Sequence, residues 1–313
     1  MDTDHWASYY RSGALVSCPT NPEPYYTMEV REAWVRFFTG LMDGDRILDL
    51  GTGNGPVALI AKETAAENSC YFDIDAVDRA DIDPHRYVPR GAHLLEGIRF
   101  HGGVDVEALP FQARQFNAVC GQYILEYTAM DETLSECARV MKPGGSCQFI
   151  LHHANSIIVR NARESLRQAE LIEETGTIRK FVEYCQRGTG ETADAELARK
   201  AVYATGKILQ ARAKSSANPL LLRFVIDSIS SLLARRSQLS YDEISAHTDE
   251  LSNELQRWVQ RLKDLSAAAL SEDQMNALVN TAEANGFFAI VSGEQYQAGT
   301  KLVGWRLIMF RGS

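Results

Sequence analysis

ILDLGTGNGPVALIA, residues 47–61, carries the strongest structural signal in this sequence. The apolar run around Asp49 predicts a buried parallel strand, because neither of its faces alternates with polar residues. The glycine-rich segment 51–55 follows where the chain must turn, and glycine, which lacks a Cβ, lets a ligand lie against bare backbone. Pro56 suits the first position of a helix, where no hydrogen-bond donor is needed. The sequence therefore predicts a strand, a glycine loop and a helix whose start faces a ligand.

Two phosphate-binding patterns do not fit this loop. The dinucleotide fingerprint G-x-G-x-x-G places a third glycine where Pro56 stands, and the loop here is spaced G-x-G-x-G. The phosphate loop that ends in Gly-Lys-Ser/Thr is also missing. The spacing thus disfavours an NAD-type oxidoreductase.

Composition sets broad limits on size and partners. The chain has 313 residues and is 45% hydrophobic, which is enough to bury a sizeable core in one large domain or two smaller ones. A formal net charge of −9 argues against a general nucleic-acid binder, which gains affinity from a basic surface. We therefore expect no nucleic-acid partner.

Cysteine spacing and the N-terminal residues indicate the compartment. Six cysteines, Cys18 among them, are scattered without a C-x-x-C pair, so we expect reduced thiols and no metal site. The first residues, MDTDHW, lack the basic start and apolar core of a signal peptide, and no apolar run approaches membrane-spanning length. These features predict a cytoplasmic protein without a membrane partner.

Strand-like and helix-like segments alternate from residue 47 to about 153, which is typical of a parallel sheet covered by helices. Strand patterning returns near the end of the chain, after a helix that ends at Asn285 and Gly286. We predict a mostly parallel, seven-stranded Rossmann-like sheet with helices on both faces. The predicted strands are 46–50, a stretch ending near Asp81, 98–102, 117–121, 147–152, 287–292 and 302–310.

A helical insertion separates the fifth and sixth predicted strands. Roughly four helices fill residues 155–270, with breaks at 188–190, at Asn218 and Pro219 as cap and first helical residue, and at 237–240. One apolar stripe within it indicates either packing in a local bundle or a seam between subunits. Its members are Ile244, Thr248, Leu251, Leu255, Trp258, Leu262 and Leu265.

The predicted domains follow from this order. An N-terminal helical cap takes residues 1–45, the Rossmann-like core takes 46–154 and 271–313, and the all-helical insertion takes 155–270. Ligands of open α/β sheets bind beyond the carboxyl ends of the strands, where the insertion begins. The insertion is therefore expected to act as a lid, a substrate-binding element or a dimerisation element.

Three further motifs follow the glycine loop in order: ADIDP at 80–84, VDVEALPF at 104–111 and FNAVCGQYILEY at 116–127. With the loop, they resemble the class I S-adenosylmethionine-dependent methyltransferase family over about residues 47–152. The resemblance implies a Rossmann-like fold, methyl transfer and S-adenosylmethionine as the cofactor. A catalytically silent binding protein on the same scaffold remains an alternative, because α/β scaffolds host many chemistries.

The first two motifs of the resemblance imply contacts to the methionine part and the ribose of the cofactor. Gly51 and Gly53 would lie against the methionine part, and Asp49 would help to orient it. An acid after the second strand would accept hydrogen bonds from both ribose hydroxyls, because a carboxylate offers two oxygens to a vicinal diol. Asp78 and Asp81 compete for this role, and the Asp-Ile-Asp-Pro context favours Asp81.

Contacts to the adenine are implied by the second and third motifs. Ile82 would pack on the ring, Asp105 would accept from the adenine amino group, and the Val106 amide would face a ring nitrogen. Val104 stands where the family has a glycine.

The end of the fourth strand and the N-terminal segment complete the implied cofactor site. Gln122 would touch the cofactor or the substrate at the carboxyl end of the strand. In similar enzymes an N-terminal helix folds over the cofactor, so Tyr10 or Arg11 would reach the methionine carboxylate. The alternative for this aromatic segment is to anchor a terminal helix on the core.

Few catalytic side chains are required, because methyl transfer from a sulfonium is a direct displacement. A base helps when the acceptor is a hydroxyl, and histidine titrates near neutral pH. His152 and His153 end the fifth strand, and adjacent strand residues face opposite ways, so at most one points into the site. We expect this to be His153, with Tyr127 lining the substrate side. The alternative is that both histidines only finish the strand.

The expected acceptor is a small molecule methylated on oxygen or nitrogen. The Asn/Asp-Pro-Pro-aromatic motif of enzymes that methylate base nitrogens is missing after the fourth strand, where GQYI stands at 121–124. A protein or carrier-bound acceptor is the alternative. The insertion also makes a homodimer possible.

Overall fold

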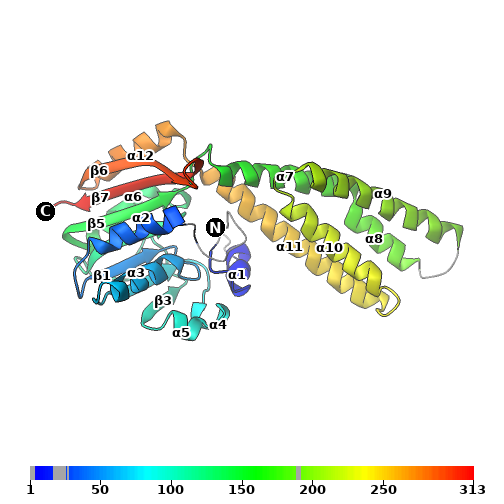
Figure 1. Ribbon diagram of the computed structural model, residues 1–313, viewed down its shortest axis with the longest axis horizontal. Coiled ribbons are helices and arrows are strands. Elements are labelled where there is room, and N and C mark those ends of the chain that lie inside the picture. The colour runs from blue at the N-terminus through cyan, green and yellow to red at the C-terminus, as the bar shows by residue number, and fades with distance from the viewer. Residues whose placement is uncertain (1–3, 17–25, 27, 188–191) are drawn as a thin grey trace. The chain divides into compact units, whose positions relative to one another are not determined.

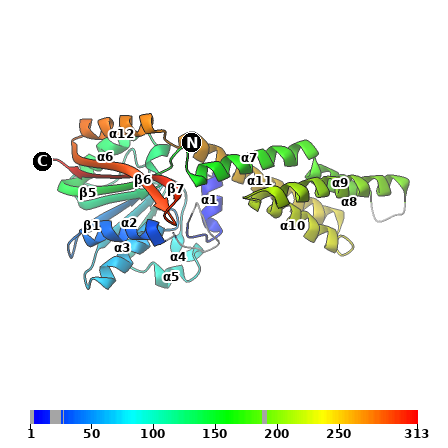
Figure 2. The ribbon, with the colours of Figure 1, turned by 45° about the horizontal axis from the view of Figure 1, so that its top comes forward.

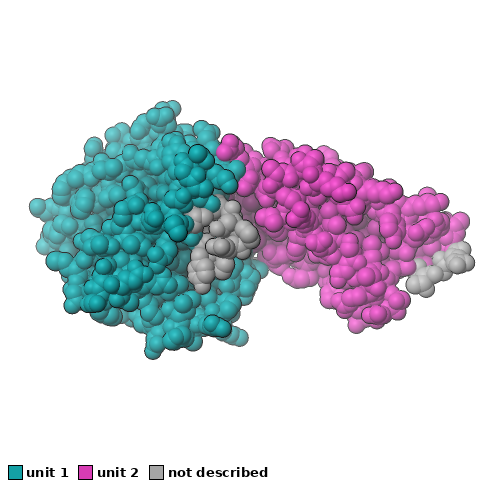
Figure 3. All heavy atoms as spheres, in the orientation of Figure 1, with its two compact units in different colours: residues 1–159, 267–313 teal, residues 160–266 magenta. Residues whose placement is uncertain are grey.

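The computed structural model describes residues 4–16, 26, 28–187 and 192–313. Cys18 and the predicted break at 188–190 lie outside these residues. The chain divides into two compact units (Figure 3). Unit 1 takes residues 1–159 and 267–313, and unit 2 takes residues 160–266.

Unit 1 is built on a seven-stranded sheet with the order β3-β2-β1-β4-β5-β7-β6 (Figure 1). Strands β1 to β5 pair in parallel, and β7 runs antiparallel to both β5 and β6. This arrangement confirms the predicted mostly parallel Rossmann-like sheet. The strands are β1 (Arg46–Leu50), β2 (Asp73–Asp78), β3 (Ile98–Gly102), β4 (Phe116–Gln122), β5 (Met141–Leu151), β6 (Phe287–Gln297) and β7 (Lys301–Arg311).

Helices cover both faces of this sheet. Figure 2 shows α6 and α12 over one face and α2 and α3 over the other. The start of α12 is set by a capping box, in which Ser271 and Gln274 satisfy each other's backbone N–H. The helical elements of unit 1 are α1 (Asp4–Arg11), α2 (Met28–Thr39), α3 (Pro56–Glu67), α4 (Pro84–Tyr87), α5 (Gly91–Leu94), the 3₁₀ turn η1 (Leu125–Tyr127), α6 (Met130–Val140) and α12 (Glu272–Ala284).

Two strand boundaries differ from the prediction. Strand β2 ends at Asp78 rather than near Asp81, because its pairing with β3 ends there, opposite Gly102, the last residue of β3. Strand β5 begins at Met141, so the predicted turn around Gly144 lies inside the strand. Gly144 adopts φ +77° there, and the β4–β5 register shifts at the same place.

Unit 2 is built from helices. Five helices are described rather than the predicted four, because Gly176 at φ +59° ends one helix and starts the next. Pro219 precedes the next-to-last helix as its N-cap instead of being its first residue. The helices are α7 (Ile157–Thr175), α8 (Thr177–Gln186), α9 (Ala193–Ser215), α10 (Leu220–Arg235) and α11 (Tyr241–Ala268).

The apolar stripe of α11 packs inside unit 2. Ile244 and Leu251 are buried in a core shared with α8, α9 and α10, and Trp258 lies against Phe224 of α10 at 5.7 Å between ring centroids. The interpretation as local bundle packing is therefore correct. None of the described helices is both long and apolar enough to span a bilayer.

The chain leaves β5 and returns to α12 along one hydrogen-bonded path. The backbone N–H of Leu270 donates to the oxygen of His152 at 2.8 Å, and the N–H of Ala154 donates to the oxygen of Leu270 at 2.9 Å. His153 and Leu270 thereby form a parallel bridge at the edge of unit 1. Both connections of the insertion are thus held side by side within unit 1.

Candidate functional site

The loop between β1 and α3 requires its glycines. Gly53 has φ +53°, and a Cβ on it would lie 2.6 Å from Cε1 of Tyr10. Gly51 has φ +58°, and a Cβ there would overlap the side chain of Ile124. Since other residues rarely adopt these dihedrals and no space exists for a side chain, glycine is needed at both positions.

Asp49 lies buried beneath this loop, 1% exposed. Its Oδ2 accepts from the hydroxyl of Thr52 at 2.6 Å, and its Oδ1 lies 3.7 Å from Sγ of Cys120. Burial raises the pKa of Asp49 to about 7, although these hydrogen bonds oppose the shift. A positive charge beside Asp49 would therefore favour its ionised form.

Asp78 is the acid at the end of β2. Its Oδ2 accepts from the backbone N–H of Gly53 and its Oδ1 from that of Ala80, both at 2.8 Å. Burial raises the pKa of Asp78 to about 6. These bonds tie the end of β2 to the glycine loop of β1.

Asp81 lies elsewhere, and the expectation that it ends the second strand is wrong. Its side chain is 85% exposed and contacts Arg11 at 3.6 Å. The strand stops three residues earlier than its sequence context indicates, at Asp78. Ile82, by contrast, is buried with Ala80 and Tyr10, as a residue under a ring site would be.

The segment after β3 approaches the same edge of the sheet. The backbone N–H of Val104 donates to the oxygen of Asp78 at 2.9 Å, which places Asp105 and Val106 beside the end of β2. Asp105 accepts from the N–H of Glu107 at 3.1 Å through Oδ1, and Val106 is buried. Two of the predicted adenine contacts therefore share an edge with the acid Asp78.

The helix α1 covers the glycine loop from the N-terminal side. The ring of Tyr10 lies against Gly53, and its backbone oxygen accepts from Nδ2 of Asn54 at 2.9 Å. Arg11 instead points to the surface and pairs with Asp81. Of the two N-terminal candidates, Tyr10 is the one at the loop. Asn54 was missed from the sequence, where nothing marks a loop asparagine as a clamp for a distant helix.

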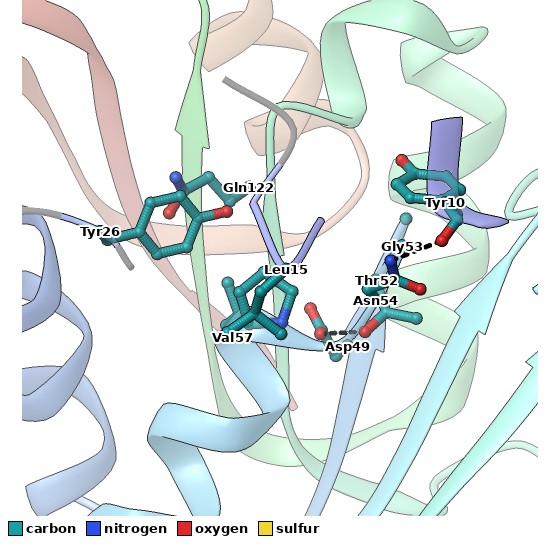
Figure 4. Close-up of a pocket in the computed structure, with 11 residues that line it drawn as sticks. Tyr10, Leu15, Tyr26, Asp49, Thr52, Gly53, Asn54, Val57 and Gln122 are labelled. Carbon is teal, nitrogen blue, oxygen red and sulfur yellow. Dashed lines mark hydrogen bonds between the residues drawn. The ribbon is translucent and has the colours of Figure 1, made fainter. Parts of the chain in front are cut away.

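Five predicted residues line one pocket (Figure 4). They are Tyr10, Asp49, Gly51, Gly53 and Gln122. Leu15 and Tyr26 also line it and carry no sequence signal that could have identified them. The pocket opens at the carboxyl ends of β1 and β4, where α/β sheets bind their ligands.

His152 and Tyr127 come together beyond the ends of β4 and β5. The ring of His152 stacks on Tyr123 at 4.0 Å between centroids, and Tyr127 meets it edge-on at 5.9 Å. Burial lowers the pKa of His152 to about 3, so the imidazole is neutral. Neither of its ring nitrogens has a hydrogen-bond partner among the described residues. Tyr127 also meets Trp6 of α1 edge-on at 6.3 Å.

His153 faces the other side of the sheet. Its ring stacks on Trp305 of β7 at 4.3 Å between centroids, and its Nε2 lies 3.5 Å from Oε1 of Glu294. The register explains this: Ile150 pairs with Gln122, so His152, two residues on, shares the face of Gln122 and His153 does not. His153 therefore faces away from Gln122, contrary to expectation, and His152 lies on the face that Gln122 occupies.

Glu126 is a further buried group that the sequence did not single out. Its Oε1 accepts from the backbone N–H of His152 at 2.6 Å, and its Oε2 has no partner among the described residues. Burial raises the pKa of Glu126 to about 8. An acid inside the apolar segment YILEY was the available signal. The described residues contain no group of three His, Cys, Asp or Glu side chains that could hold a metal ion.

Solved structures to which this chain is similar share little sequence with it. The 1,6-didemethyltoxoflavin-N1-methyltransferase of Burkholderia thailandensis is 12% identical, with a TM-score of 0.45 over 92% of this chain and 80% of that one. The DszA carbon methyltransferase is 14% identical, with a TM-score of 0.43 over 90% of this chain and 52% of that one.

Sequence comparison gives the family. A curated relative, the ubiquinone/menaquinone biosynthesis C-methyltransferase UbiE of Xylella fastidiosa (strain M12), is 33% identical over 131 residues, 40% of this chain and 50% of that protein. The enzyme of the same name from Stenotrophomonas maltophilia is 33% identical over 130 residues, again 40% and 50% of the two chains. The chain thus spans about half the length of these relatives. Residues 48–149 match the family model of a methyltransferase domain, and this segment is a methyltransferase domain of the class I S-adenosylmethionine-dependent family.

Proposed function

We propose that this protein transfers a methyl group from S-adenosylmethionine to a small-molecule acceptor by direct displacement. The observation that carries this proposal is the pocket in which Asp49, Gly51, Gly53 and Gln122 meet at the carboxyl ends of β1 and β4. Nε2 of Gln122, one of the residues that line it, is a buried donor without a hydrogen-bond partner among the described residues. An unpaired buried donor suits a bound polar ligand.

Asp49 and Asp78 would hold different parts of the cofactor. Asp49 suits the ammonium of the methionine part, since a cation beside a carboxyl of pKa about 7 favours ionisation. Asp78 replaces Asp81 as the proposed acceptor for the ribose hydroxyls. Each of its oxygens receives one backbone N–H and keeps a lone pair for a hydroxyl donor.

The adenine would lie between the ends of β2 and β3. Asp105 is proposed to accept from the amino group, and Val106 and Ile82 to bracket the ring. Ile82 and Val106 are both buried, and the N–H of Val104 ties this segment to Asp78. Apolar side chains with one acceptor beside them match a purine that carries one exocyclic donor.

The cofactor supplies an activated methyl group, so the protein's task is to align the acceptor and exclude water. Tyr127 and His152 are proposed to line the acceptor side, because His152 shares the face of Gln122 and the ring of Tyr127 lies 5.9 Å from that of His152. The neutral imidazole of His152 can accept a hydrogen bond from a hydroxyl group of the methyl-accepting substrate. We therefore assign His152 the role of orienting that substrate.

An oxygen or nitrogen atom is the proposed methyl acceptor. A carbon nucleophile is the second candidate, because the curated relatives are named as C-methyltransferases. Transfer of a labelled methyl group to a panel of phenols, amines and enolisable ketones would separate these classes. A product labelled only on carbon would refute the first choice.

We propose that unit 2 acts as a lid, a substrate-binding element or a dimerisation element. Light scattering on the full chain tests dimerisation, since a homodimer doubles the measured mass. A monomer across the concentrations used for activity would remove dimerisation as its role.

Calorimetric titration with S-adenosylmethionine, S-adenosylhomocysteine and NAD tests the proposed cofactor. We expect both S-adenosyl ligands to bind and NAD not to bind. Asp78→Ala is expected to weaken binding at least about tenfold through the lost charge-assisted hydrogen bonds. The matched variant Asp81→Ala, at an exposed acid, should leave the affinity unchanged. A folded protein that binds neither S-adenosyl ligand would overturn the proposal.

A further inference from the structure

The side-chain amide of Gln122 is held in one orientation. Its Oε1 accepts from the indole Nε1 of Trp34 at 2.6 Å, and both residues are buried, Trp34 completely. An indole N–H only donates, so only the oxygen end of the amide can face it. Trp34 therefore determines that the NH₂ end of Gln122 points the other way.

Gln122 is one of the residues that line the pocket. Asp49 and Gly53 line it as well (Figure 4), and Nε2 of Gln122 has no hydrogen-bond partner among the described residues. A buried donor left unpaired costs free energy, and buried polar groups are rarely left so. The orphaned donor indicates that a ligand supplies an acceptor at this position.

Trp34 is itself fixed. Its ring stacks on Phe38 at 5.9 Å between centroids and meets Phe37 edge-on at 6.2 Å. A second buried amide secures the same turn of α2, because Nε2 of Gln148 donates to the oxygen of Ala33 at 3.2 Å. The indole N–H is thus presented to Gln122 from a rigid turn of helix rather than from a free side chain.

We propose that Trp34 is a positioning residue for the cofactor, orienting Gln122 so that Nε2 donates to the carboxylate of its methionine part. This inference rests on the proposed function. Within the methionine part, the ammonium and sulfonium are cationic and accept no hydrogen bond, so the carboxylate is the only acceptor. Asp49, on the same pocket, is an acid and suits the ammonium instead. Gln122 and Asp49 would thus bind the carboxylate and the ammonium of the same amino-acid group.

The test compares two ligands by calorimetry. S-adenosylhomocysteine carries the amino-acid group, and 5′-methylthioadenosine lacks it. Trp34→Phe keeps an aromatic ring and removes the N–H, whereas Gln122→Glu keeps an acceptor for Trp34 and replaces the donor with a carboxylate. We expect each variant to bind S-adenosylhomocysteine at least about tenfold more weakly, and to bind 5′-methylthioadenosine as the unaltered protein does.

A matched variant separates positioning from general loosening. Gln148→Met removes the other buried amide bond to α2 and leaves the Trp34–Gln122 pair intact, so it should bind both ligands normally. In a Gln122→Ala background, Trp34→Phe should have no further effect on S-adenosylhomocysteine, because the two residues act through one contact.

Two results would overturn the role of Trp34. One is a Trp34→Phe protein that binds S-adenosylhomocysteine as tightly as the unaltered chain. The other is an equal loss for both ligands, which would indicate a structural effect. Failure of the unaltered protein to bind S-adenosylhomocysteine would instead overturn the proposed function itself.

Discussion

Replacing Glu126 by glutamine should make the protein more stable near neutral pH. The carboxyl of Glu126 is buried, accepts the backbone N–H of His152 at 2.6 Å through Oε1, and has a pKa raised by burial from 4.5 to about 8. Glutamine keeps an acceptor oxygen for the same N–H and cannot ionise. The variant therefore removes the ionisation while preserving the hydrogen bond.

The size of the gain depends on pH in a defined way. Because the pKa of Glu126 is raised in the folded state, its contribution to stability is complete below about pH 4.5 and is lost as pH rises towards 8. Each pH unit in this window lowers the unfolding free energy by about 1.4 kcal/mol. At pH 7 the accumulated loss is about 3 kcal/mol. Glu126→Gln should be more stable by up to that amount at pH 7 and should show almost no gain at pH 4.5.

Urea denaturation of Glu126→Gln and of the unaltered protein at several pH values from 5 to 8 measures the difference between their unfolding free energies. Glu107→Gln is a matched control, because Glu107 also accepts one backbone N–H, from Ala129 at 2.8 Å, but is only half-buried. A difference in unfolding free energy between Glu126→Gln and the unaltered protein that stays constant with pH would refute the reasoning.

Three further changes probe the loop, the opposite edge of the sheet and the end of β5. Gly53→Ala should lower the unfolding free energy, measured by chemical denaturation, by more than Gly97→Ala does. Both glycines have positive φ, so both variants share a backbone strain of about 1–2 kcal/mol, but only at Gly53 would a Cβ meet Tyr10, at 2.6 Å. Equal losses of unfolding free energy would contradict this contact. Asp75→Asn should lower the unfolding free energy by about 3 kcal/mol in the same assay at pH 7. Asp75 is buried and accepts four hydrogen bonds from two arginines and a histidine. A loss of unfolding free energy under about 1 kcal/mol would contradict this reasoning. Burial lowers the pKa of His152 from 6.5 to about 3, so its contribution to stability is present above pH 6.5 and is lost as pH falls. Between pH 6.5 and 4, the unfolding free energy of His152→Gln should fall by about 3 kcal/mol less than that of the unaltered protein. Parallel pH profiles of the two proteins would contradict this.

The sequence was most informative where one residue type has one physical use. The apolar run of β1 and the glycines after it predicted both the strand and the loop, because no other residue fits at Gly51 and Gly53. Asn285 and Gly286 likewise identified the end of α12, where Asn285 is the C-cap and Gly286 adopts φ +82°. In both places the local chemistry alone is sufficient to specify the backbone.

Tertiary pairing decided the residues that the sequence misplaced. Asp78 rather than Asp81 ends β2, because the strand's length depends on its pairing with β3, which ends at Gly102. His152 rather than His153 shares the face of Gln122, because the choice depends on a register with β4 that periodicity alone does not give. Gly176 divided a predicted helix, since an isolated glycine within a helical pattern is often tolerated.

The bridge between His153 and Leu270 has a consequence for the order of folding. Forming it from an unfolded chain closes a loop that contains all of unit 2, at an entropic cost of about 4 kcal/mol by chain-length scaling. Helices form from near neighbours in sequence and do not need this closure. If unit 2 condenses first, it shortens the effective loop, and the pairing of β7 with β5 becomes faster. Early folding of the insertion would then speed completion of the sheet.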